Sequence, residues 1–116
     1  MKPSTEKDSI AAIAAAKKER AHVAIDLSAL IHNLQQAQQH CPSSKVIPVI
    51  KSDAYGHGVI PVANAILSSP QETSLLAVAT FAEALELQDY VDEADSSVQV
   101  LLLSGFQTTA QLEILI

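Results

Sequence analysis

The stretch Val46-Ile47-Pro48-Val49-Ile50-Lys51-Ser52-Asp53-Ala54-Tyr55-Gly56-His57-Gly58 decides the fold of this chain. Its first five residues are apolar and mostly β-branched, which is typical of a strand buried on both faces. The polar residues that follow place Lys51 at the carboxyl end of that strand, with Tyr55 in the turn beyond it. Pro48 counts against a regular strand, because proline donates no hydrogen bond to a ladder.

Lys51 and Tyr55 offer the two groups that suit an aldehyde cofactor with a phosphate. A lysine ε-amine that has lost its proton forms a Schiff base with an aldehyde, and a phenolic hydroxyl donates a hydrogen bond to a phosphate. Gly56 and Gly58 allow unusual backbone angles and close approach. Without such a motif, a lysine at a strand end is usually solvated and a tyrosine usually packs against the strand edge. His57 is interpreted as a hydrogen-bonding brace in preference to a proton carrier.

The segments around this motif alternate between strand and helix patterns. Strands are predicted over residues 22–27, 45–50, 75–79 and 98–103. Helices are predicted after a capping Ser28, over residues 59–67 and 81–91, and after Thr108 or Thr109. Alternation of this kind indicates an α/β fold with parallel strands and right-handed crossovers.

Composition excludes several classes of function. A formal net charge of −6 over 116 residues argues against a nucleic-acid surface, which requires a basic face. No apolar run approaches the roughly 20 residues of a membrane span. Cys41 is the single cysteine, so no intrachain disulfide is expected, and its thiol is interpreted as inert and partly buried. No cluster of ligands has zinc spacing, so no metal site is expected, and the cytoplasm is the default location.

The two ends of the chain differ from its middle. Residues 1–20 are interpreted as an N-terminal extension, in which Ser9 caps a helix through the alanines that follow. This apolar segment is short and flanked by charges, so no secretory signal is expected. Residues 111–116 form an apolar helix pattern without a capping residue, so the chain is expected to be a truncated piece of a domain.

Three separate stretches resemble the alanine racemase family. Residues 24–34 (AIDLSALIHNL) are similar to its opening strand and helix, and residues 51–58 (KSDAYGHG) match its lysine motif. The next strand and helix are resembled by Leu76-Ala77-Val78-Ala79 with Glu83-Ala84-Leu85, and the strand after that by Leu101-Leu102-Leu103. The resemblance covers about residues 21–116; its lysine motif is specific and its flanking matches support that motif.

The resemblance implies the N-terminal portion of a TIM-like (β/α)8 barrel that binds pyridoxal 5'-phosphate (PLP), incomplete over residues 21–116 and without the family's C-terminal β domain. It implies an isomerase, alanine racemase, which interconverts L-alanine and D-alanine and supplies D-alanine for peptidoglycan. By resemblance, Lys51 is the cofactor lysine and one of two acid/base groups, Tyr55 holds the phosphate, and Leu103 lines the cofactor pocket. The family works as a homodimer.

Two departures from the family pattern are visible. The family commonly has Ala-Asn where this chain has Ser52-Asp53, so Asp53 places a negative charge where a neutral amide is usual. The family's second base, a tyrosine from the partner subunit, cannot be assigned here. Its arginine at the pyridine nitrogen cannot be assigned either, because Arg20 is the only arginine. Two alternatives to a racemase stay open, a non-catalytic PLP-binding module and an inactive truncated product.

Overall fold

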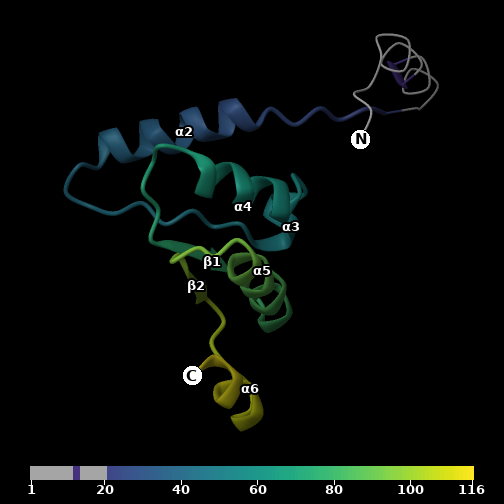
Figure 1. Cartoon of the computed structure of the whole chain (residues 1–116), viewed down its shortest axis with the longest axis vertical. Coiled ribbons are helices and arrows are strands. Elements are labelled where there is room, and N and C mark those ends of the chain that lie inside the picture. Colours follow the sequence, from purple (N-terminus) through teal and green to yellow (C-terminus); the bar gives the residue numbers. More distant parts are fainter. Residues whose placement is uncertain (1–11, 14–20) are drawn as a thin grey trace.

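The structure, a computed structural model, describes residues 12–13 and 21–116. The helix expected after Ser9 therefore lies almost entirely outside the described residues. The elements are α2 (Leu27–His40), α3 (Lys51–Tyr55), α4 (Val59–Ser68), β1 (Leu75–Val78), α5 (Phe81–Glu93), β2 (Gln99–Leu102) and α6 (Thr109–Leu115) (Figure 1). From α4 onward this order is the alternation of helix and strand that the sequence predicts.

The strands of the sheet are parallel, as the alternation predicts. β1 pairs with β2 in a register that places Leu75 opposite Gln99 and Val78 opposite Leu102. On the other side of β1, the Ile50 N–H donates to the Ala77 carbonyl at 2.8 Å, and the Ala77 N–H donates to the Pro48 carbonyl at 2.9 Å. β1 is thus the central strand, between β2 and the segment that leads into Lys51.

Two predicted strands differ from the structure. Residues 22–26 form no strand, because no described segment pairs with them and a strand needs a neighbour for its hydrogen bonds. Residues 45–50 make only an isolated bridge, Val49 to Ala77, because Pro48 has no N–H to donate. Helix α2 is capped by Asp26, whose carboxylate accepts a hydrogen bond from the Ala29 N–H at 3.1 Å, so Ser28 is not the cap.

The core is aliphatic and lies between the sheet and its helices. Its largest fully buried side chains are Ile66, Leu76, Leu87, Val62, Val78 and Val91. Burying each such side chain stabilises the fold by roughly 1.5–3 kcal/mol. α4 and α5 contact each other, and α2 lies against α4. Cys41 ends α2 and is exposed, which corrects the expectation of a partly buried thiol.

Among the described residues, the helices that build the core cover one face of the sheet. Ile50, Leu76 and Val78 belong to the core. The residues that alternate with them point to the other face, where Val49 and Leu101 are 39% and 38% exposed. One covered face and one open face are typical of a sector of a (β/α)8 barrel, whose open face lines the barrel interior.

Candidate functional site at the carboxyl ends of the strands

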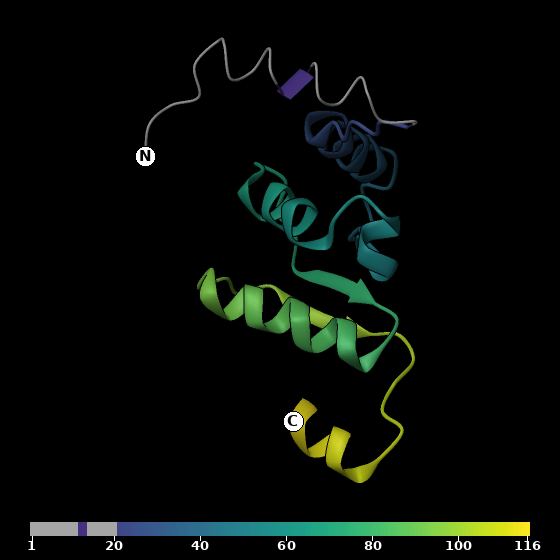
Figure 2. The same cartoon turned by 90° about the vertical axis from the view of Figure 1, so that its right-hand side faces the viewer.

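Two of the three residues singled out by the sequence, Lys51 and Leu103, lie at the carboxyl ends of the parallel segments that flank β1, and Tyr55 follows Lys51 by four positions. Lys51 directly follows Ile50 and is half-buried. Leu103 directly follows β2, and its N–H donates to the Val78 carbonyl at 2.9 Å. Tyr55 ends α3 and is 60% exposed. Figure 2 shows α3 and the segment that leaves β2 at the same end of β1, which is the end where parallel βα units bind their ligands.

α3, which carries Lys51, is a left-handed turn. Positive φ angles run without interruption through Ser52 (52°), Asp53 (54°), Ala54 (54°), Tyr55 (57°) and Gly56 (84°). Left-handed backbone costs roughly 1–2 kcal/mol for each residue other than glycine, so the four others together store roughly 4–8 kcal/mol. Such a turn persists only where its surroundings hold it in place.

Hydrogen bonds within the motif hold the second half of this turn. The Asp53 carbonyl accepts a bond from the Gly58 N–H at 2.9 Å, and the Asp53 carboxylate accepts one from the Val59 N–H at 2.8 Å. Because Val59 begins α4, Asp53 caps that helix from outside. His57 Nδ1 lies 2.8 Å from the Ala54 carbonyl, which can only accept, so the ring nitrogen donates. The structure thus confirms that His57 is a brace.

Glu83 holds the first half of the turn, and the residue-by-residue interpretation of the sequence missed it. One carboxylate oxygen accepts bonds from the Thr80 N–H at 2.9 Å and the Ala79 N–H at 3.2 Å. The other oxygen accepts a bond from the Ser52 N–H, next to Lys51. The spacing Thr80-x-x-Glu83 is a capping-box signal that predicts the bond to Thr80. No local pattern predicts the bond to Ser52.

These hydrogen bonds set the acidity of Glu83. The bond from the Ser52 N–H is the largest cause, and it lowers the pKa of Glu83 below its ordinary value of 4.5. Partial desolvation opposes it, and the bonds from Thr80 and Ala79 lower the pKa further. The ionised form of Glu83 is therefore the form that the folded chain favours.

Acidification should remove the stabilisation that Glu83 provides. Since the folded-state pKa is lower than the unfolded value of 4.5, this contribution is present above that pH and is lost as the pH falls through the folded-state pKa. We expect urea unfolding of the full-length protein between about pH 6 and about pH 3 to show a smaller loss of stability in Glu83→Gln than in the wild type. Equal losses in both proteins would contradict this assignment.

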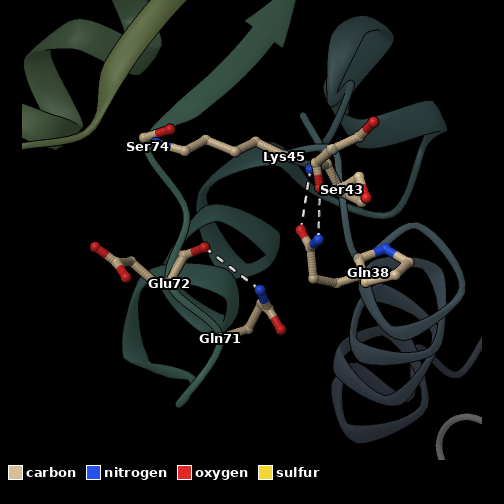
Figure 3. A pocket seen from close by; sticks show the side chains of 9 residues that line it. Gln38, Ser43, Lys45, Gln71, Glu72 and Ser74 are labelled. Atoms are coloured by element: carbon tan, nitrogen blue, oxygen red, sulfur yellow. Dashed lines mark hydrogen bonds between the residues drawn. The ribbon is translucent and has the colours of Figure 1, made fainter.

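A polar hollow of about 420 Å³ lies at the opposite end of the sheet, beside the loops that precede the strands (Figure 3). The Gln38 side chain crosses it, donating to the Ser44 carbonyl at 2.6 Å and accepting from the Val46 N–H at 3.1 Å. Lys45 also lines it, at the amino end of the segment that leads into Lys51. We assign this hollow to loop positioning, since the Gln38 amide is already bonded to backbone.

Two further observations concern the part of the chain that the structure describes. It contains no group of three or more His, Cys, Asp or Glu side chains that could hold a metal ion. None of its helices combines the length and the apolar character that a membrane span requires.

Comparisons with known proteins agree on one family. Residues 25–116 match the model of the alanine racemase N-terminal domain. The alanine racemase of Synechocystis sp. is 38% identical over 97 residues, which are 83% of this chain and 24% of that protein. The alanine racemase of Aliivibrio salmonicida is 41% identical over 93 residues, 79% of this chain and 24% of that protein. The chain thus spans about a quarter of the length of these curated relatives.

A solved structure gives the same result at the level of the fold. The crystal structure of the biosynthetic alanine racemase from Pseudomonas aeruginosa matches with a TM-score of 0.65 and 31% sequence identity. The match covers 78% of this chain and 23% of that chain. The fold of this chain therefore has a counterpart in part of a solved racemase.

Proposed function

Because the chain belongs to the alanine racemase N-terminal domain family, we propose that it is the cofactor-bearing part of a PLP-dependent racemase that interconverts L-alanine and D-alanine. One observation carries this proposal: a left-handed turn holds Lys51 at the carboxyl end of a parallel segment. The relatives that share this part of the chain are named alanine racemases. That name favours a racemase over a non-catalytic PLP-binding module.

The residues at this end of the sheet fit PLP. Lys51 offers an amine for the aldehyde, and the exposed Tyr55 offers a hydroxyl for the phosphate. A Cβ added at Gly56 would meet nothing within 4 Å, so the turn leaves room beside its backbone. Leu103, 54% exposed, offers an apolar surface for a ring. When bound, PLP supplies an electron sink that stabilises negative charge at the α-carbon of an amino acid.

Lys51 has two tasks in this proposal. Its ε-amine anchors the cofactor, and it exchanges a proton with the α-carbon of alanine from one side. The rigid turn limits where that amine can reach, and a fixed position is what a proton transfer requires. Tyr55 and Leu103 bind and orient the cofactor and move no proton.

Tyr55→Phe should weaken PLP binding more than it slows turnover. A hydrogen bond to a charged group is worth roughly 1.5–3 kcal/mol, so PLP affinity should fall about 10- to 100-fold. Equilibrium dialysis of PLP with the full-length protein measures the affinity, and activity at saturating PLP measures turnover. Tyr90→Phe is the matched control, because its hydroxyl donates to Asn64 at 3.0 Å, between α5 and α4. Unchanged PLP affinity with a large fall in turnover would make Tyr55 a catalytic group instead.

The family resemblance supports three more parts of the proposal. They are a homodimeric enzyme, a cytoplasmic location and the supply of D-alanine for peptidoglycan. The size of the full-length protein in solution and the D-alanine dependence of a strain without it would test the first and the last.

A further inference from the structure

We propose that Glu83 is a positioning residue for Lys51: its carboxylate ties the left-handed turn to the start of α5 and so fixes the place of the amine. The importance of that amine rests on the proposed function. The tie itself is a property of the fold and can be tested without the cofactor.

The hydrogen bond acts on the peptide group of Lys51 itself. The Ser52 N–H and the Lys51 carbonyl belong to one planar peptide unit, so the bond from Ser52 to Glu83 fixes the plane from which the lysine side chain departs. The second carboxylate oxygen is held by the N–H groups of Ala79 and Thr80, directly after β1. Glu83 thus joins the carboxyl end of the central strand to the residue that bears the amine.

No bond within the motif replaces this one. Among the described residues, the bonds from Gly56, His57 and Gly58 close the second half of the turn. The Ala54 N–H donates to the Ile50 carbonyl at 3.1 Å, which spans the first half without holding the Ser52 N–H. Because this backbone has the unfavourable hand, a freed Ser52 amide would let the turn relax and the amine move with it.

The chemistry of the site requires a carboxylate. All three partners of Glu83 are N–H donors, and a carboxylate carries only acceptors. In Glu83→Gln, the amide oxygen can keep the bonds from Ala79 and Thr80, and the amide NH2 then faces the Ser52 N–H. The variant should therefore keep the cap of α5 and lose the bond to the turn. Glu83 and Glu86 both line a hollow of about 330 Å³. Glu86 accepts no hydrogen bond among the described residues, so Glu86→Gln is the matched charge control.

The experiment measures the Ser52 amide directly in the full-length protein without PLP. Hydrogen exchange at Ser52 should be slow in the wild type although the residue is exposed, because its N–H is bonded. It should be at least about tenfold faster in Glu83→Gln and unchanged in Glu86→Gln. Thr80→Ala, which weakens the cap of α5 but leaves the Ser52 bond, should also keep Ser52 slow.

A second measurement links the tie to the amine. With PLP and borohydride, the rate of covalent labelling of Lys51 should fall about tenfold in Glu83→Gln and keep its wild-type value in Glu86→Gln. The kcat for alanine should fall by a similar factor with a smaller change in KM, because the alanine site itself is intact.

The outcomes separate this inference from the proposed function. If the Ser52 amide of the wild type exchanges as fast as the amide of an unstructured peptide, the positioning role is overturned. This result counts even if the wild type is an active racemase, and it does not depend on whether Glu83→Gln folds. A protected amide that the Gln variant leaves unchanged also overturns it. A protected wild-type amide that Glu83→Gln frees, in a protein that never takes a label on Lys51, overturns the proposed function and leaves the tie intact.

Discussion

In the full-length protein, Lys51→Ala is expected to abolish the racemisation of alanine and to leave PLP without a covalent anchor. The reason is that Lys51 serves both as the anchor and as a proton-exchanging group, and acid/base help alone is typically worth 10²- to 10⁴-fold. Borohydride reduction followed by peptide mapping should place a pyridoxyl label on Lys51 in the wild type and on no lysine in the variant.

Lys45→Ala is the matched control for this result. Lys45 belongs to the same predicted strand but lies at its amino end, beside the hollow that Gln38 crosses. The variant should keep both the label and the activity. A label on Lys45 with Lys51 unmodified would overturn the assignment of the cofactor lysine.

The polypeptide of residues 1–116, expressed alone, should racemise alanine at least about 10²- to 10⁴-fold more slowly than a full-length relative. Lys51 reaches one face of the α-carbon, and inversion needs a second group on the other face. Within the turn, His57 Nδ1 is engaged by the Ala54 carbonyl, and Tyr55 is proposed to hold the phosphate.

The same polypeptide should associate in solution. Among the described residues, Val49 and Leu101 on the open face lie outside the core and stay 39% and 38% exposed, and strand edges that stay unpaired promote aggregation. A D-alanine assay with added PLP and light scattering of the purified polypeptide test both statements. A monomer that racemises alanine about as fast as a full-length relative would contradict the interpretation as part of a barrel.

The sequence predicts well the helices and strands whose periodicity and ends are marked by residues within or directly beside them. α4, β1, α5 and β2 all lie within two residues of their predicted bounds, because periodic apolar residues and flanking turn residues mark each of them. Thr108 caps α6 as one of the two threonines proposed for that role. Lys51 directly follows the apolar segment 45–50, which bridges to β1 at Val49, so the position of the candidate site follows from the sequence.

The features that escaped prediction depend on distant partners. Residues 22–26 alternate like a strand, but a strand pattern pairs only where another segment supplies hydrogen bonds. The left-handed hand of α3 opposes the preferences of Ser52, Asp53 and Ala54. It is stabilised by groups such as Glu83, which lies 31 positions beyond Ser52. Secondary-structure propensities depend on residues that are neighbours along the chain. They therefore predict neither the left-handed conformation of the turn nor the bond from Ser52 to Glu83.

The structure also gives Asp53 a specific place. Its carboxylate oxygen accepts the bond from the Val59 N–H, and the amide oxygen of an asparagine could accept the same bond. The departure from the family's Ala-Asn thus preserves the cap of α4. The departure does change the charge of the site, because a carboxylate stands where a neutral amide is usual. Asp53 lines the same hollow as Glu83 and Glu86, so three carboxylates gather there.

The left-handed turn also determines which chirality of amino acid its positions accept most easily. Its backbone angles are those that a mirror-image helix would have, and residues of the opposite chirality adopt them without the steric clash that opposes them here. A chain assembled by chemical ligation should therefore tolerate D-serine at the exposed position 52, whereas a D-residue inside α4 or α5 would disrupt the helix. Among the described residues, this turn is the one run of several consecutive residues with a reversed backbone hand, and it presents the lysine that in the proposed function works on one face of the alanine α-carbon.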